Sequence, residues 1–160
     1  MNRIPYIIFF SFFNLFYFPH AFAQSVEQQQ IKQLAFLTGK WNGTSKSYEK
    51  EKLVKEVPAW EEIQFKLDSC IITIDLRSES LQLHTVINYS KKDKTYYYHP
   101  FYQTGNAKYP AKLVNNQLIV QASPSKRFIF HRLEDGRFQE YGEELIDGKW
   151  VKYFEDTFKQ

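Results

Sequence analysis

The stretch that decides the fold class is residues 126–159, which read KRFIFHRLEDGRFQEYGEELIDGKWVKYFEDTFK. Two Asp-Gly pairs, Asp135-Gly136 and Asp147-Gly148, separate three runs in which apolar and polar residues alternate. Alternation with a period of two is typical of half-buried strands, and Asp-Gly is a preferred pair in tight hairpin turns. We therefore predict two hairpins that join strands over Lys126–Leu133, Arg137–Ile146 and Lys149–Lys159.

The same alternation continues upstream and predicts a chain built almost wholly from strands. A first strand is expected to open at Trp41, and the mixed-charge residues 46–56 after it fit an exposed loop or hairpin at a barrel mouth. Further strands are expected over Trp60–Leu67, Cys70–Leu76, Leu81–Tyr89, Lys94–Gln103, Ala107–Val114 and Gln117–Gln121. Turns at short, even intervals are typical of a sandwich or an up-and-down barrel and not of βαβ units. We predict an all-β, antiparallel up-and-down barrel of about 8–10 strands, because closing the sheet removes exposed edges.

A short helix is predicted ahead of the strands, over Ser25–Leu37. Ser25 followed by Gln28 has the spacing of a capping box, in which each side chain satisfies a backbone N–H of the other. The apolar residues Ile31, Leu34 and Ala35 recur at the spacing of one helix face. Gly39 is placed to end the helix, since glycine readily adopts the left-handed conformation found there.

Two segments resemble a known group of proteins. Residues 34–43, LAFLTGKWNG, resemble the opening of lipocalin-like (calycin) β-barrels, and residues 143–154, EELIDGKWVKYF, resemble the last hairpin of exported bacterial lipocalin-like proteins of unknown function. The resemblance implies that the helix closes the base of a barrel and that Gly39 and Trp41 form a structural plug there. It also implies that a basic side chain from the last strand stacks over Trp41, for which Lys149 and Lys152 are the candidates.

The N-terminal residues 1–23 have the three parts of a secretory signal peptide. Arg3 supplies a positive charge, Ile4–Phe18 is almost wholly apolar, and Ala21-Phe22-Ala23 offers small residues at the cleavage site. The apolar run is shorter than the roughly twenty residues of a membrane span. We therefore expect cleavage before Gln24, export to the periplasm or the medium, no stable membrane anchor after cleavage, and one barrel domain over residues 24–160.

Charge and cysteine content narrow the function classes. Cleavage removes Arg3 and leaves 20 basic and 18 acidic residues. So balanced a charge does not indicate a nucleic-acid partner or an anionic membrane surface. Cys70 is the only cysteine, so no intramolecular disulfide forms and the fold depends on its hydrophobic core. Cys70 itself is expected at a buried strand position, where thiols are inert.

The more apolar face of each strand is expected to line the barrel, which predicts an interior for a small apolar or aromatic molecule. The expected interior residues are Ile63, Phe65, Ile72, Ile74, Leu83 and Ile87, joined by either Phe128 and Phe130 or Ile129 and His131. Tyrosines and a histidine over residues 96–102 would orient the ligand with their polar tips, or else decorate the outer face. The candidate ligand-binding residues are Phe65, Ile74, Leu83, Tyr97, His99, Phe130, His131 and Tyr141.

Other chemistries have less support in the sequence. The three histidines of the expected domain lie on different strands, so no local spacing predicts a metal site. A haem-binding barrel of the nitrobindin type, with His131 as the iron ligand, is an alternative because the opening residues also resemble that group. No motif of nucleophilic or phosphate chemistry occurs, and we expect no catalytic residues. Glu140 and Glu144 share a strand face that Glu62 would oppose, but solvated faces explain such charges. A protein-interaction module using the outer face is a further alternative.

Overall fold

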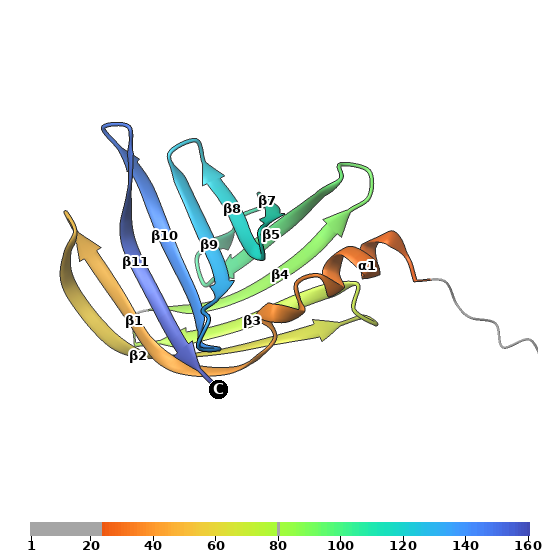
Figure 1. The fold of residues 1–160 in the computed structure, drawn as a ribbon, viewed down its shortest axis with the longest axis horizontal. Helices are drawn as coiled ribbons and strands as arrows, with labels where there is room; N and C mark the ends of the chain where they lie inside the picture. Colours follow the sequence, from red (N-terminus) through yellow and green to blue (C-terminus); the bar gives the residue numbers. More distant parts are fainter. Residues whose placement is uncertain (1–23, 80) are drawn as a thin grey trace, which may run out of the picture.

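The computed structural model describes residues 24–79 and 81–160, so the predicted signal peptide, residues 1–23, lies outside the described residues. Within them, ten antiparallel strands form a closed barrel, with one extra short strand and a short helical segment before the barrel (Figure 1). The all-β barrel prediction is confirmed. The elements are α1 (Val26–Lys32), a 3₁₀ turn (Ala35–Leu37), β1 (Gly39–Glu49), β2 (Lys52–Lys66), β3 (Ile71–Ser78), β4 (Gln82–Ser90), β5 (Thr95–Tyr102), β6 (Gly105–Asn106), β7 (Tyr109–Val114), β8 (Gln117–Ser123), β9 (Lys126–Arg132), β10 (Phe138–Ile146) and β11 (Lys149–Lys159).

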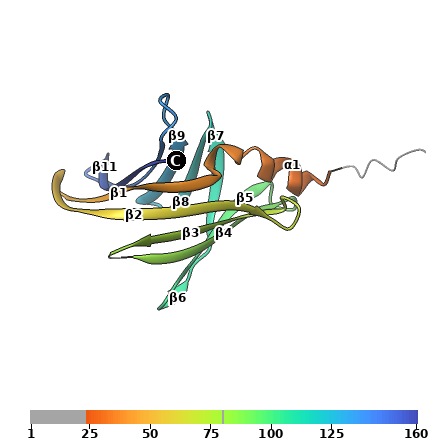
Figure 2. The same ribbon diagram turned by 90° about the horizontal axis from the view of Figure 1, so that it is seen from below.

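The strands follow one another around the barrel in chain order. Each pairs with its neighbour in sequence, except that β5 passes to β7 and the small β6 pairs only with the end of β5. Figure 2 shows β6 projecting from the body of the barrel. The ring closes where the first strand meets the last, with Asn42 opposite Lys159 and Ser47 opposite Phe154. Among the described helical segments, none is long and apolar enough to cross a membrane.

The hairpin turns use residues with positive φ, as tight two-residue turns require. Asp147 and Gly148 have φ of 50° and 76°, and the β7–β8 turn at Asn115-Asn116 has φ of 50° and 59°. The mixed-charge segment is also a hairpin, because β1 continues to Glu49 and β2 begins at Lys52 instead of at Trp60. Its turn residues, Lys50 and Glu51, have positive φ as well, at 48° and 64°. Of the loop and the hairpin that the charged sequence allowed, this segment forms the hairpin.

The predicted helix over Ser25–Leu37 is divided in two. Its start is as expected, since Ser25 and Gln28 form the capping box, but α1 ends at Lys32 and a separate 3₁₀ turn follows. The break lets Leu34 and Leu37 both bury fully, and this apolar burial outweighs the continuity of a short helix. Gly39 does not end the helix. It begins β1 with φ of 154°, and a Cβ there would lie 2.9 Å from the Trp41 ring.

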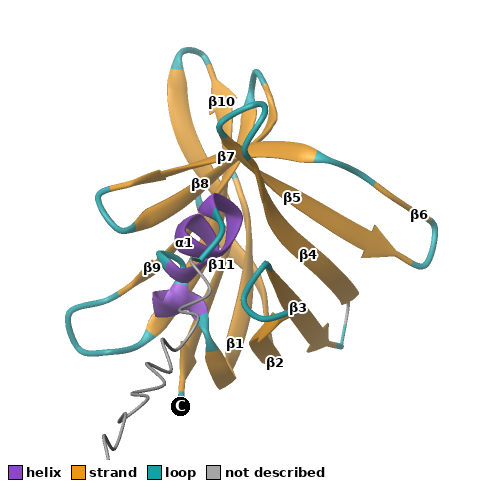
Figure 3. Ribbon diagram, turned by 90° about the vertical axis from the view of Figure 1, so that its right-hand side faces the viewer, coloured by secondary structure: helices purple, strands orange, loops and turns teal. Residues whose placement is uncertain are grey.

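Figure 3 shows α1 lying across one end of the barrel. Trp41 is fully buried beneath the 3₁₀ turn that follows α1. Its indole Nε1 donates a hydrogen bond of 2.9 Å to the carbonyl of Leu37. The guanidinium of Arg132, on β9, lies 4.5 Å from the Trp41 ring and donates from Nε to the carbonyl of Phe36 at 2.9 Å. The predicted basic partner from the last strand is therefore wrong, because Lys152 faces outward and lies over Tyr141 instead.

The orientation of β9 decides which aromatic residues face the interior. Phe128 and Phe130 point into the barrel, where Phe130 packs against Tyr98 with ring centroids 5.6 Å apart. Successive side chains of a strand point to opposite faces of the sheet. Ile129 and His131 accordingly lie on the outer face, where His131 contacts Tyr141 edge to face.

Candidate functional site

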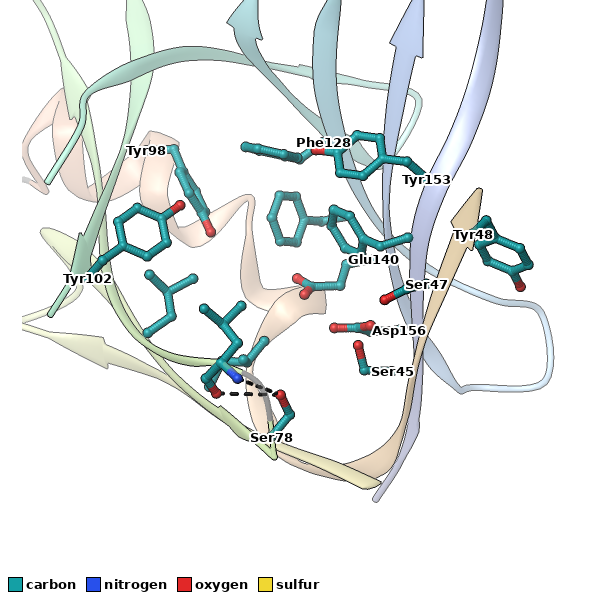
Figure 4. Close-up of a pocket in the computed structure, with 15 residues that line it drawn as sticks. Ser45, Ser47, Tyr48, Ser78, Tyr98, Tyr102, Phe128, Glu140, Tyr153 and Asp156 are labelled. Atoms are coloured by element: carbon teal, nitrogen blue, oxygen red, sulfur yellow. Dashed lines mark hydrogen bonds between the residues drawn. The ribbon is translucent and has the colours of Figure 1, made fainter. Parts of the chain in front are cut away.

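A partly open cavity of about 480 Å³ with an aromatic wall lies in the barrel (Figure 4). Phe128 is central to this wall, with ring centroids 6.2 Å from Tyr98 and 6.1 Å from Phe154. Tyr153 continues it, 5.3 Å from the Phe154 ring. Gly142 faces Phe154 across β10 and β11 and makes room for that ring, since a Cβ at Gly142 would lie 2.3 Å from it. This side of the cavity is therefore largely apolar and aromatic.

Two carboxyl groups lie on the cavity wall among these aromatic rings. Glu140 and Asp156 are 6% and 4% exposed, and they stand directly opposite each other on β10 and β11. The same cross-strand row continues to Ser45 on β1 and to Phe130 on β9, and all four residues line the cavity. Directly opposed residues share one face of a sheet. Figure 4 shows the carboxyl groups of Glu140 and Asp156 near each other, with Ser45 beside Asp156.

A third carboxyl group, from Glu61 on β2, is buried close to this pair. Glu61 is 1% exposed and stands between Trp41 of β1 and Leu76 of β3, the latter a cavity-lining residue. Among the described residues, neither oxygen of Glu61 has a hydrogen-bond partner, and Oδ1 of Asp156 also has none. Unpartnered buried carboxyl oxygens are costly to the folded state. We call Glu61, Glu140 and Asp156 the acid trio.

Burial shifts every member of the acid trio towards its protonated form, and repulsion within the trio adds to this for Glu61 and Glu140. Burial, and then the charge of Asp156, raise the pKa of Glu61 well above its usual range. Burial, and then the charges of Glu61 and Asp156, do the same to the pKa of Glu140. Burial raises the pKa of Asp156 to about 6, although hydrogen bonding with Ser45 and Glu140 acts to lower it. Asp156 is therefore the member most readily ionised near neutral pH.

The acid trio has no cationic partner within the described part of the chain. No lysine, arginine or histidine is among the described residues that line the cavity. The ion pairs between described residues do not include any member of the trio, and Arg132 is engaged at the base with Trp41. The described histidine, cysteine and acidic residues form no group of three arranged to hold a metal ion.

The sequence-predicted ligand-binding residues fall into two groups. Leu83 and Phe130 lie on the cavity wall, while Phe65 and Ile74 lie inside the barrel as part of the core or packed against it. The other four occupy the outer face, and each has a partner there. Lys108 Nζ lies 3.8 Å from the Tyr97 ring, His99 hydrogen-bonds Asn88 at 2.9 Å, His131 hydrogen-bonds Gln139 at 3.0 Å, and Tyr141 lies under Lys152.

Sequence reasoning missed the acid trio because it treated the paired carboxylates as solvated. The neighbour expected to face Glu140 was Glu62, but Glu62 is the outward member of its pair and forms an ion pair with Lys40 at 3.3 Å. The signal that would have found the trio is strand parity. Glu140 is two residues from Phe138, and Asp156 is two from both Phe154 and Phe158, all of which face the interior.

No protein-family model matches the sequence, and no curated protein is significantly similar to it. A crystal structure of a protein of unknown function from the DUF3598 family of Nostoc punctiforme is similar at a TM-score of 0.30 and 8% identity. The match covers 86% of this chain and 100% of that one. At this level of similarity, no function is transferred.

Proposed function

We propose that this protein binds a small, largely apolar molecule inside its barrel. The observation that supports the proposal is the cavity of about 480 Å³ with its wall of aromatic side chains. This volume lies within the range of roughly 300–1,000 Å³ that is typical of small-molecule sites. Burial of apolar ligand surface would supply the affinity, at about 25 cal/mol for each Å² removed from water.

Two further parts of the proposal concern compartment and kinship. We propose that the protein acts outside the cytoplasm, because residues 1–23 carry the pattern of a signal peptide, and that it is related to lipocalin-like barrels. The helix that covers the Trp41 end of the barrel supports the kinship. Expression with fractionation, followed by N-terminal sequencing, tests export. A mature chain that begins at Gln24 in the periplasm or medium is expected, and an uncleaved cytoplasmic chain would contradict it.

Binding is tested with N-phenyl-1-naphthylamine, an uncharged apolar fluorophore that brightens when it leaves water. Purified protein should bind it saturably at one site per chain. The variant Ser47→Trp places a large ring in the cavity, because Ser47 lines it. We expect the dissociation constant of the fluorophore to rise by at least about tenfold, because the tryptophan ring would occupy cavity volume that the fluorophore needs.

A neighbouring position provides the matched control. Lys46→Trp introduces the same ring one residue earlier on β1, where the native side chain faces outward and lies 3.8 Å from Glu56. This variant should bind the fluorophore as the unmodified protein does. Circular dichroism should show that both variants keep their β-structure. The proposal fails if the unmodified protein does not bind the fluorophore, or if Ser47→Trp and Lys46→Trp bind it equally well.

A further inference from the structure

We propose that the natural ligand is a small aromatic or arylalkyl amine, whose ammonium group binds at Glu140 and Asp156, with Glu61 buried beside them, while its apolar body lies against the aromatic wall. This inference rests on the proposed function, since it assigns the ligand class of the same cavity. Within the described residues, the barrel interior holds buried acidic groups without matching basic groups. Three carboxyl groups are buried there, and none of them has a cationic partner among the described residues.

The position of the trio favours a ligand over a purely structural role. Glu140 and Asp156 are on the wall of the cavity, and Oδ1 of Asp156 is buried without a hydrogen-bond partner among the described residues. Glu61 stands beside them with both oxygens unpartnered. An ammonium group has three N–H donors and a positive charge, and it has no acceptor. It therefore supplies what the trio lacks, both in hydrogen bonds and in charge.

The remainder of the cavity wall fits an aromatic body attached to such a group. Phe128 and Phe130 both pack against Tyr98, with ring centroids 6.2 Å and 5.6 Å from the Tyr98 ring. Aromatic faces attract cations as well as apolar groups, and the attraction is strongest where water is excluded. A bare metal ion fits less well, because the described residues form no metal-holding group and the cavity is far larger than an ion.

The charge state of the trio adds a measurable consequence. The groups that act on it are Ser45 on β1, Glu155 on β11 and the trio members themselves. Tyr98 on β5 faces the trio, and burial, followed by the charges of Glu140 and Glu61, raises its pKa. Burial holds the pKa values of the trio high, and an incoming ammonium would lower them by favouring the ionised forms. Amine binding should therefore release protons to the solvent, whereas binding of an uncharged ligand should not.

The experiment compares three ligands that share an indole ring: tryptamine, uncharged 3-ethylindole and anionic indole-3-propionate. Each is titrated by calorimetry at pH 7.5 in two buffers with different ionisation enthalpies, and each is also tested for displacement of N-phenyl-1-naphthylamine. Tryptamine should bind at least about tenfold more tightly than 3-ethylindole and far more tightly than indole-3-propionate. Only tryptamine should release protons, and its affinity should fall as the pH drops below about 6.

Variants locate the effect at the trio. Asp156→Asn and Glu140→Gln should each remove most of the preference for tryptamine over 3-ethylindole. The control Glu62→Gln, on the outer side of β2 beside Lys40, should keep it. If the first two variants do not fold, proton release and pH dependence in the unmodified protein decide the matter.

The outcomes separate this inference from the proposed function. Fluorophore binding combined with equal affinity for tryptamine and 3-ethylindole overturns the amine assignment and leaves the binding function intact. Preference for indole-3-propionate also overturns it, since it would show that the protonated trio accepts anions. An undiminished preference in Asp156→Asn and Glu140→Gln overturns the placement at the trio. Failure of every ligand, the fluorophore included, refutes the binding function itself.

Discussion

Replacing Asp156 by asparagine should change how the stability of the ligand-free protein depends on pH. The folded protein raises the pKa of this carboxyl from 3.8 to about 6, chiefly through burial. Between these two values the folded chain holds a proton that the unfolded chain has lost, so stability falls as the pH rises. A tenfold change in an equilibrium is worth about 1.4 kcal/mol, so the complete loss amounts to about 3 kcal/mol once the pH exceeds 6.

Asparagine cannot ionise, so Asp156→Asn should lack this loss. We expect the free energy of unfolding of the variant, relative to the unmodified protein, to rise by about 2 kcal/mol between pH 4 and pH 7.5, since part of the full loss has already occurred at pH 4. Taking the difference between two pH values cancels any constant effect of the new amide group. Removing the charge of Asp156 also relieves Glu61 and Glu140, and this acts in the same direction.

Urea unfolding followed by tryptophan fluorescence at several pH values measures this quantity, and buried Trp41 reports on the barrel interior. Glu56→Gln is the control, because Glu56 is exposed on β2 and lies 3.8 Å from Lys46. A surface ion pair of this kind contributes little to stability, so its removal should have a small effect at every pH. The reasoning is refuted if the relative stability of Asp156→Asn changes by less than about 0.5 kcal/mol, the usual range for a surface substitution.

Three further substitutions test the packing of the barrel, each by urea unfolding against the unmodified protein. Arg132→Gln removes the cation over Trp41 and should cost about 1–3 kcal/mol; unchanged stability would show that the contact is incidental. Gly142→Ala puts a Cβ 2.3 Å from the Phe154 ring, and the forced shift should cost about 1–3 kcal/mol and weaken fluorophore binding. Glu51→Gly relieves a turn residue with φ of 64° and should stabilise the protein by about 1 kcal/mol, whereas a loss of stability would contradict the turn geometry.

The sequence predicted the strands best where a turn signal and an alternating run agree. The Asp147-Gly148 hairpin appears where expected because Asp-Gly pairs accept positive φ cheaply. The turn at Lys50-Glu51 also has positive φ at both residues, but lysine and glutamate are not residues that indicate such a turn in a sequence. Near its start, the strand that follows this turn carries Leu53 and Val54, which are adjacent and both about half exposed, so no apolar alternation marked it.

The candidate site was harder to predict because it depends on which residues meet across the barrel. Leu83 and Phe130 were found from apolar alternation alone, and both lie on the cavity wall. The basic partner of Trp41 was expected from the last strand, but it comes from β9. The side chain of Arg132 points into the barrel and lies over Trp41, whereas the side chain of Lys152 points outward. Side-chain direction reverses with each residue, so a choice such as Glu61 against Glu62 needs the register of the sheet.

The pairing of β1 with β11 has a consequence for how this chain acquires its structure. Every strand from β2 to β10 lies between these two partners in sequence, so β1 keeps one unpaired edge until the ring is nearly complete. Contacts so distant in sequence form slowly, and an open strand edge invites pairing with other chains. Lysines at positions 40 and 46, with glycine at 43, make this edge charged and weakly β-forming. The polar first strand thus protects the unfinished barrel from aggregation at the stage when it is most exposed.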